Sequence, residues 1–464
     1  MLKTHSCGEL NRKHIGTEVS LAGWVDRRRD HGGLIFIDLR DKEGTTQIAF
    51  NPEIAGECHE TASRMRSEYV VRITGKVTAR PAGTENPKLA TGYVEIIAKS
   101  AEILNQARTP PFYINEDSDV EESLRLRYRY LDIRRSRMKK NLILRHRTIK
   151  YIRDFLDERG FIEVETPILI KSTPEGARDY LVPSRLHAGK FYALPQSPQQ
   201  IKQLLMVAGM EKYFQIARCF RDEDTRADRQ PEFTQLDLEM SFIDEEDILN
   251  LFEELFIGMV AEVKPDMSIL KPFPHLSYTE AMEHYGSDKP DLRFGMEIAD
   301  LTDIAGETDF AIFRSVAGEG GRIKGIAAPG CGGYSRRQLD ELNRRVRQTG
   351  AGGLVTIALG EPGISMDDLT MDMVKSVASK FLTLEQVRQM AERIGATVGD
   401  LMLIVAGNDS VVSSALGDLR MEMGNRLDLA DKNLLAFAFI RDFPLFHWDN
   451  KIKRWDSEHH PFTA

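Results

Sequence analysis

Hydrophobic and polar residues alternate with a period of two in two neighbouring runs, residues 214–221 and 235–242. This period is typical of β-strands with one face in a core and one polar face. Because Ala217 and Cys219 on the polar face are small, we expect that face to form a concave floor with room for a ligand. The charged and amide residues expected on this floor are Arg221, Gln235, Asp237 and Glu239.

The loop between the two strands carries more charge than a hairpin connection needs. Charges of both signs suit a ligand that presents phosphates together with a metal ion. An ordinary surface hairpin could have the same composition, so composition alone leaves both interpretations open. The charged residues of the loop are Arg221, Asp222, Glu223, Asp224, Arg226, Asp228 and Arg229.

Five shorter runs with β-strand character lie near the N-terminus, and a helical stretch at residues 53–65 separates the third from the fourth. This order suggests an OB-fold barrel, which binds single strands through basic residues and stacking aromatics. Arg29 and Phe36 fit that use, although a run of arginines is more often a solvated turn and a lone Phe more often core. The five runs are residues 19–26, 34–39, 46–50, 69–77 and 93–98.

Helical periodicity begins after a Pro-containing, acidic segment at residues 106–123, which we expect to be a hinge. Residues 124–159 are basic and predict one helix with a buried stripe, ended by Gly160. The stripe is expected to contain Leu142, Ile149, Ile152, Phe155 and Leu156.

The C-terminal part changes character at residues 295–425, where glycine-rich turns and short strands predict a separate α+β domain. Two amphipathic helices are expected there, near residues 335–348 and 384–395. We find no catalytic set of residues in this domain. Residues 436–440 are continuously apolar, as in a central strand.

The composition is that of an ordinary globular protein with more than one domain: 464 residues, 42% hydrophobic and 29% charged. The net charge of −9 does not by itself indicate a nucleic-acid-binding protein. The four cysteines are scattered, which supports neither disulfides nor a zinc site. No apolar run approaches the ~20 residues that cross a bilayer, and the start lacks a signal-peptide core, so we expect a cytoplasmic protein.

Two segments carry a recognisable order of residues. Phe-Arg-Asp-Glu at 220–223, followed by Arg-x-x-x-Phe-x-x-x-Asp at 229–237, is similar to motif 2 of the class II aminoacyl-tRNA synthetases. Residues 160–167 are similar to motif 1 of that class, which forms the interface of a homodimer. Along its whole length the chain resembles the bacterial-type aspartyl-tRNA synthetases.

The resemblance implies a multidomain α+β fold. Residues 1–105 would form an OB-fold β-barrel that binds the anticodon, and residues 106–123 a hinge. Residues 124–294 would form a class II catalytic domain built on an antiparallel sheet. Residues 295–425 would be the inserted α+β domain of bacterial members, after which residues 426–464 resume the catalytic domain.

The resemblance also implies a site for L-aspartate. In the family, residues 171–180 form a loop that closes over the amino acid, and Glu175 stands where the ammonium group is held. Lys202 would pair with the side-chain carboxylate of the substrate, which asparagine lacks; without the neighbouring motif, Lys202 would be assigned to a solvated helix face. The implied aspartate-binding residues are Glu175, Ser197, Gln199, Gln200, Lys202, Arg221, Asp237, His459 and His460.

The implied reaction is activation of L-aspartate by ATP to aspartyl-adenylate, followed by transfer to the terminal ribose of tRNA. The substrate carboxylate attacks the α-phosphorus, so the developing charge requires cations such as Arg221 and Mg²⁺. No side chain has to act as a nucleophile. No metal-binding residue is identifiable in the sequence. The implied ATP-binding residues are Arg221, Asp222, Glu223 and Gln230.

Residues 23–38 are similar to the anticodon-binding domain of the family. The resemblance implies that Phe36 stacks on the middle anticodon base while Arg29 and Gln47 read base edges. His31 and Gly83 resemble the residues of members that charge two tRNAs, tRNA(Asp) and tRNA(Asn), which differ only at the third anticodon base. We therefore expect tRNA(Asp), and also tRNA(Asn), as partners.

A third motif of the family, Gly-rich with a closing Arg, is missing before Ala464. We therefore expect a C-terminally truncated polypeptide that does not form aspartyl-adenylate at a useful rate. Lysyl- and asparaginyl-tRNA synthetases share the same plan, but Lys202 and the large insertion favour aspartate. A non-catalytic tRNA-binding fragment or a degenerate paralogue is the alternative from another class, and only the missing end favours it.

Overall fold

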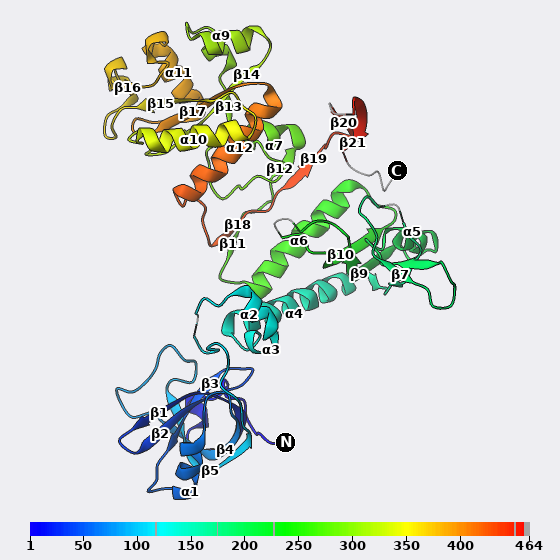
Figure 1. The fold of residues 1–464 in the computed structure, drawn as a ribbon, viewed down its shortest axis with the longest axis vertical. Helices are drawn as coiled ribbons and strands as arrows, with labels where there is room; N and C mark the ends of the chain where they lie inside the picture. The colour runs from blue at the N-terminus through cyan, green and yellow to red at the C-terminus, as the bar shows by residue number, and fades with distance from the viewer. Residues whose placement is uncertain (117, 174, 226–227, 450–451, 459–464) are drawn as a thin grey trace. The chain divides into compact units, whose positions relative to one another are not determined.

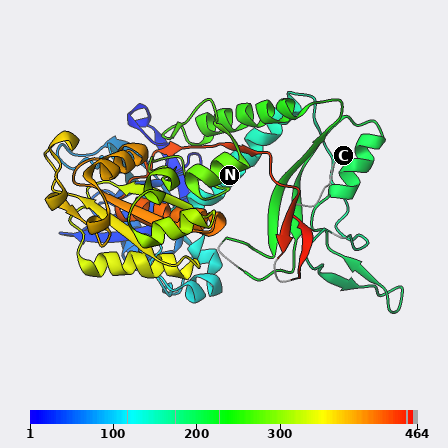
Figure 2. The same ribbon diagram turned by 90° about the horizontal axis from the view of Figure 1, so that it is seen from above.

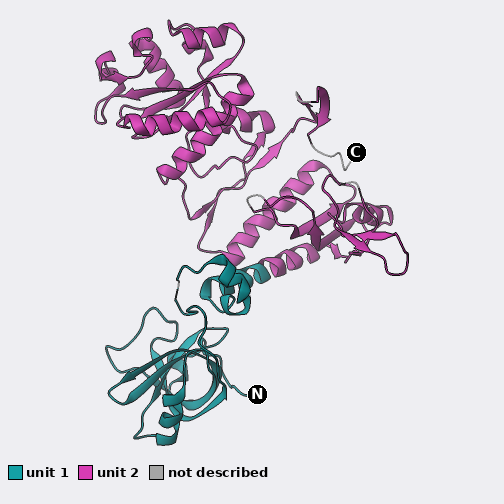
Figure 3. Cartoon of the chain, in the orientation of Figure 1, with its two compact units in different colours: residues 1–147 teal, residues 148–464 magenta. Residues whose placement is uncertain are grey.

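The computed structural model describes residues 1–464 except 117, 174, 226–227, 450–451 and 459–464. The chain divides into two compact units, Met1–Arg147 and Thr148–Ala464 (Figure 3). Each unit has hydrophobic cores of its own.

The first unit contains the expected barrel. Its five strands close in the order β1-β2-β3-β5-β4 around a core that includes Leu21, Ile37 and Ile48. This confirms the prediction of an OB-fold barrel. A short 3₁₀ helix, η1 (Arg12–His14), precedes the barrel. The other elements are β1 (Glu18–His31), β2 (Leu34–Arg40), β3 (Thr45–Phe50), α1 (Gly56–Arg64), β4 (Val70–Ala79) and β5 (Val94–Asn105).

Strand β1 extends to His31, beyond the predicted end at residue 26. Its register against β2 shifts between Val25 and Arg27, which is the mark of a β-bulge. After the bulge none of its residues is buried, so the alternation that reveals a strand in sequence stops there. A β-bulge is therefore the physical reason for the missed boundary.

The predicted single helix over residues 124–159 is wrong. The segment forms three helices, α2 (Glu122–Arg127), α3 (Arg129–Asp132) and α4 (Ser136–Asp157). The chain bends where Asp132, fully buried, accepts hydrogen bonds from Arg125 and Arg129. Leu142, expected in the buried stripe, is 47% exposed, whereas Ile152, Phe155 and Leu156 are buried.

In the second unit, a three-stranded sheet of order β10-β9-β6 carries the alternating runs (Figure 2). Its apolar face, with Phe214, Leu236 and Leu238, packs against helices α4 and α6. The second face is polar, as the alternation predicts. The surrounding elements are β6 (Ile162–Glu163), β7 (Leu181–Pro183), β8 (Phe191–Ala193), α5 (Gln199–Val207), β9 (Lys212–Phe220), β10 (Glu232–Met240) and α6 (Glu245–Val263).

The predicted central strand at residues 436–440 is also wrong. Only residues 439–440 are in a strand, β19 (Phe439–Arg441), and residues 436–438 connect it to β18 (Leu434–Leu435); these two short strands pair in separate two-stranded sheets. Phe437 instead stacks between Phe256 and Phe273, which accounts for its apolar character. The elements of this region are β11 (Ser268–Ile269), β12 (His275–Ser277), α7 (Tyr278–Tyr285), β18 (Leu434–Leu435), β19 (Phe439–Arg441), β20 (Phe446–Asp449) and β21 (Arg454–Ser457).

An antiparallel sheet of order β13-β14-β17-β15-β16 lies within residues 295–425. Helices α8, α9 and α11 pack on one face, and α10 and α12 pack on the other (Figure 1). Both amphipathic helices are confirmed, as α10 and α11. The elements are β13 (Ala299–Asp300), α8 (Thr302–Gly306), α9 (Ala311–Gly318), β14 (Arg322–Ala328), α10 (Arg336–Gln348), β15 (Leu354–Leu359), η2 (Met366–Asp368), η3 (Met371–Met373), β16 (Val374–Lys375), η4 (Ser379–Phe381), α11 (Leu384–Ile394), β17 (Leu401–Gly407) and α12 (Asp409–Arg426).

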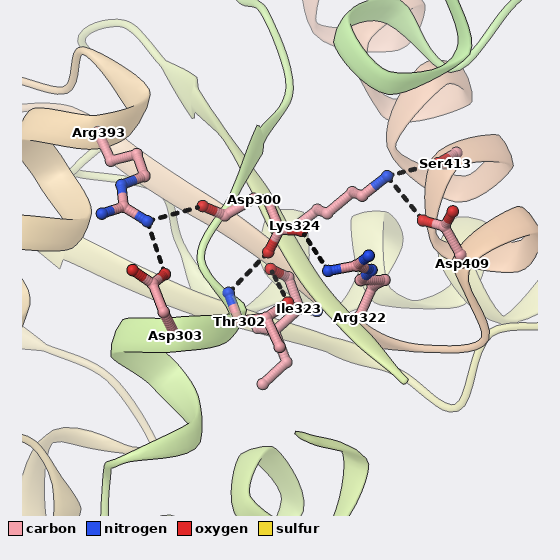
Figure 4. A network of polar contacts seen from close by, with 9 residues as sticks. All are labelled: Asp300, Thr302, Asp303, Arg322, Ile323, Lys324, Arg393, Asp409 and Ser413. Carbon is pink, nitrogen blue, oxygen red and sulfur yellow. Dashed lines mark hydrogen bonds and ion pairs between the residues drawn. The ribbon is translucent and has the colours of Figure 1, made fainter. Parts of the chain in front are cut away.

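A network of charged residues lies where β13 meets β14, beside a cavity of about 600 Å³ (Figure 4). Each of its three cations pairs with a carboxylate, so charge is balanced within the network. The pairs are Lys324 with Asp409 at 2.6 Å, Arg322 with Asp300 at 3.3 Å, and Arg393 with Asp303 at 2.6 Å.

Candidate functional site

The polar face of the β9–β10 hairpin forms the floor of the candidate site. The cross-strand register pairs Gln235 with Ala217 and Asp237 with Gln215. Small residues thus stand beside the polar ones, as the sequence pattern predicts. Ala217 and Cys219 are only 2% and 0% exposed, so neighbouring side chains cover this part of the floor.

Lys202 of α5 reaches this floor and lies between two carboxylates. Its Nζ atom is 2.9 Å from Asp237 Oδ1 and 3.3 Å from Glu239 Oε2. The three side chains are only 12%, 10% and 19% exposed. Ion pairs shielded from water in this way interact more strongly than pairs on the surface. Lys202 alone faces the two carboxylates Asp237 and Glu239, so a positively charged group of a ligand could also bind here.

Two buried polar atoms on this floor have no hydrogen-bond partner among the residues that the structure describes: Asp237 Oδ2 and Arg221 Nε. Leaving such an atom unpaired costs about 1–3 kcal/mol. The Arg221 guanidinium also lies over the ring of Phe233, 5.1 Å from its centroid. A polar ligand could form hydrogen bonds with both of these unpaired atoms.

Neutral groups on the same face are joined to one another by hydrogen bonds. Gln215 accepts hydrogen bonds from the hydroxyls of Thr166 and Tyr213, each at 3.0 Å. Cys219 donates to Gln235 Oε1 at 3.1 Å. Burial, and then the nearby Asp237, raises the pKa of Tyr213, and burial raises the pKa of Cys219 to about 11. Both groups are therefore uncharged near neutral pH.

Glu175 and Ser197 come together beside the floor. Glu175 accepts hydrogen bonds from Ser197 Oγ at 2.6 Å and from Thr173 Oγ1 at 2.9 Å. The neighbouring Gln196 is almost fully buried and holds the loop at residues 171–180. Sequence reasoning missed Gln196, because its burial depends on a loop that packs on it from a distant part of the sequence. A cavity of about 100 Å³ here is lined by Thr166, Pro167, Ile170, Lys171, Thr173, Glu175, Pro195, Ser197, Pro198, Gln200 and Ile201.

The other predicted residues of the site have different surroundings. The Asp222 N–H donates to the Arg178 carbonyl at 3.0 Å, and Glu223 pairs with Arg229 at 3.2 Å. Gln199 lies in the first turn of α5, where its N–H donates to Ser197 Oγ at 3.3 Å. Gln230 is exposed. The predicted His459 and His460 lie outside the described residues.

A second candidate site lies on the outer face of the barrel. Arg29 Nη2 donates to Asp38 Oδ1 at 2.7 Å and to Gln47 Oε1 at 3.2 Å. Gln47 in turn donates to the buried Glu95 at 2.8 Å. Asp38 is only 15% exposed, and this partial burial raises its pKa even though Arg29 opposes that shift. The structure thus joins Arg29 and Gln47 in one network, as a shared recognition surface requires.

The bulge in β1 brings the aromatic residue to this network. Beyond the bulge Arg29 stands opposite Phe36 in the β1–β2 pair, so both lie on one face. The His31 ring lies 6.2 Å from the Phe36 ring. Phe36 is only partly buried, which leaves ring surface for stacking. Gly83 lies in a turn with φ of +86°, and its N–H donates to Glu85.

Within the part of the chain that the structure describes, no three or more His, Cys, Asp or Glu residues come together in a group that could hold a metal ion. None of the helices within it combines the length and apolar character needed to cross a bilayer.

Two family models match the sequence. Residues 121–464 match the class II tRNA synthetases (D, K and N), and residues 19–104 match the OB-fold nucleic acid binding domain. Among curated proteins, the aspartate–tRNA(Asp/Asn) ligase of Dehalococcoides mccartyi strain 195 is 63% identical over 464 residues, which are 100% of this chain and 77% of that protein. The ligase of the same name from Moorella thermoacetica is 53% identical over 461 residues, 99% of this chain and 75% of that protein.

Solved structures share the fold at low sequence identity. The asparaginyl-tRNA synthetase of Pyrococcus horikoshii, complexed with asparaginyl-adenylate, superposes with a TM-score of 0.54 at 20% identity and covers 90% of this chain and 96% of that one. The asparaginyl-tRNA synthetase of Entamoeba histolytica gives a TM-score of 0.52 at 17% identity, covering 89% and 94%. At this identity the comparison concerns the fold alone.

Proposed function

The chain belongs to the class II tRNA synthetases of the aspartate, lysine and asparagine group, and on that premise we propose that it is a ligase that activates L-aspartate with ATP and transfers it to tRNA. The curated relatives, named aspartate–tRNA(Asp/Asn) ligases, support this choice within the group. The observation that carries it is Lys202 buried between Asp237 and Glu239.

The charges of the site complement those of L-aspartate. The ligand has two carboxylates and one ammonium group, and the site offers two cations and several carboxylates. We assign Lys202 to the side-chain carboxylate, Arg221 to the α-carboxylate, and Asp237 with Glu175 to the ammonium group. The unpaired Asp237 Oδ2 and Arg221 Nε atoms support these roles, because the ligand would satisfy both.

Further residues are assigned to the same pocket. Ser197, Gln199 and Gln200 would line it from the start of α5. His459 and His460 would close it, a role that rests on the family resemblance alone.

ATP would bind at the end of the hairpin where the loop between β9 and β10 begins and ends. Arg221 would shift from the substrate carboxylate toward the α-phosphate as the bond forms, since its fork of donors suits both groups. Glu223 would contact the adenine or ribose end of ATP, and Gln230 another part of it, with Asp222 also assigned to the ATP site. The ATP of such ligases is normally accompanied by Mg²⁺, but the described residues contain no metal-binding group, so no protein ligand is assigned to the ion.

The outer face of the barrel would bind the anticodon. Phe36 would stack on the middle base, with Arg29 and Gln47 at base edges. The relatives' names support tRNA(Asn) as a second substrate beside tRNA(Asp), and we assign His31 and Gly83 to this relaxed choice. Equal binding of the two transcripts is expected, and a preference above about a hundredfold would contradict dual recognition.

Assembly, location and domain limits complete the proposal. We propose a homodimer formed through residues 160–167, in the cytoplasm. The domain limits at residues 105, 123, 294 and 425 stay predictions.

Isothermal titration with L-aspartate tests the proposed function without requiring turnover. Saturable binding at one site per chain is expected. A lack of binding at millimolar L-aspartate, with a folded protein by circular dichroism, would overturn the assignment of this pocket.

A further inference from the structure

Gln196 connects the loop at residues 171–180 to the body of the site. It is only 1% exposed. Its Oε1 atom accepts from the Ala177 N–H at 3.0 Å, and its Nε2 atom donates to the Ala177 carbonyl at 2.9 Å and to Asp179 Oδ1 at 2.5 Å. One side chain therefore satisfies both backbone groups of a loop residue and a loop carboxylate.

The chemistry of these bonds requires a carboxamide. The side-chain oxygen accepts one hydrogen bond and the NH₂ group donates two. Gln has both groups, whereas an ionised Glu has no donor. Asp179 is also bound at its other oxygen by Ser172, so the two ends of the loop are tied together. The backbone N–H of Asp222, in the loop after β9, donates to the Arg178 carbonyl. The loop is thus held at three consecutive residues, 177–179.

This attachment fixes Glu175. Only Gly176 separates Glu175 from Ala177, and its φ of +96° turns the chain sharply. Ser197, next to Gln196 in sequence, donates to Glu175 Oε2. The position of the Glu175 carboxylate therefore depends on two neighbouring side chains, one that holds its loop and one that holds the carboxylate itself.

We infer that Gln196 is a positioning residue that latches the loop closed and so aims Glu175 at the ammonium group of L-aspartate. This inference rests on the proposed function. Gln196 does not touch the substrate in this account; it acts through Ala177 and Glu175. Removing its amide would leave the partly buried Ala177 N–H and carbonyl without these partners and release the loop.

A comparison of L-aspartate binding with succinate binding distinguishes this positioning role from simple structural support. Succinate has the two carboxylates of aspartate but no ammonium group. If Gln196 aims Glu175, then Gln196→Met should weaken L-aspartate binding about tenfold and leave succinate binding unchanged. A general loss of stability would weaken both ligands equally.

The experiment is calorimetric titration of the full chain with L-aspartate and with succinate, combined with hydrogen exchange of the peptide that contains residues 171–180. Wild type is compared with Gln196→Met, Gln196→Glu and the remote control Gln389→Met. We expect faster loop exchange and a lower aspartate-to-succinate preference in both Gln196 variants, and wild-type behaviour in the control. Gln196→Glu keeps the acceptor and provides a second test if Gln196→Met does not fold.

An unchanged preference in the Gln196 variants would overturn the inference even if loop exchange rises, because Gln196 would then be only structural. Failure of the wild type to bind L-aspartate would instead overturn the proposed function. In that case, an unaltered exchange rate in the variants would also refute the latch.

Discussion

The outer face of the barrel and the floor of the β9–β10 hairpin differ in how far their cations are exposed to solvent. On the barrel, Arg29 pairs with Asp38, and its side chain remains 38% exposed. On the floor, Lys202 is 12% exposed and shares two carboxylates. On the barrel, Arg29 reaches into solvent beside the partly buried Phe36 ring, although its partners Asp38 and Gln47 are only 15% and 9% exposed. On the floor, the cation itself is held away from water.

This difference predicts different modes of recognition. A nucleic acid can bind on top of the barrel network by stacking, with modest contributions from each contact. A ligand that binds on the floor must separate Lys202 from its carboxylates. It binds only if its own charged groups form new ion pairs with the side chains that it separates. Selectivity for charge should therefore be much stricter on the floor than on the barrel.

The largest effect is expected from Lys202→Met. Without Lys202, Asp237 and Glu239 would lie together with no cation, and breaking such a buried pair costs about 3–5 kcal/mol. L-aspartate binding should fall by about a hundredfold or more, and chemical denaturation should show the loss of stability. The control is Lys289→Met, because that side chain is 85% exposed and should change stability by less than about 0.5 kcal/mol. Equal stabilities of the two variants would contradict the buried pair.

A smaller effect is expected from Phe36→Ala on the barrel. Loss of one stacked base costs about 1–3 kcal/mol, so affinity for an anticodon stem-loop should fall roughly tenfold to a hundredfold. Stability should change little, because Phe36 is only partly buried. Fluorescence anisotropy would measure binding, with the exposed Phe381→Ala as a control that leaves it unchanged. Unaltered binding in Phe36→Ala would place the RNA elsewhere.

The smallest effect concerns the thiol on the floor. Because burial raises the pKa of Cys219 to about 11, only a small fraction is thiolate at pH 8, and alkylation should be slower than for an ordinary thiol. The rate should rise with pH toward 11 and fall when L-aspartate is bound. Peptide-resolved mass spectrometry after iodoacetamide treatment measures this. Rapid alkylation at pH 8 would show that the floor is open to water.

Sequence reasoning works best where periodicity reports burial directly. The hairpin, the barrel and helices α10 and α11 were all predictable, because each has one face in a core. Lys202 and Asp237 could be placed together through the family resemblance, and the structure joins them.

The misses share a physical cause. Gln196 is buried by a loop from elsewhere in the chain, and Asp132 is buried because arginines surround it. The β-bulge in β1 hides the last residues of the strand, since they have no buried side. Such features depend on contacts between specific side chains, which cannot be predicted from the pattern of hydrophobic residues.

The most direct test of the account is the ratio of affinities of the wild-type chain for L-aspartate and L-asparagine, measured by calorimetry at neutral pH. The two ligands are nearly equal in shape and differ in the charge that Lys202 would meet. If Lys202 selects the substrate, L-aspartate should bind about a hundredfold or more tightly than L-asparagine. Equal affinities would show that Lys202 remains committed to Asp237 and Glu239 and does not select the substrate.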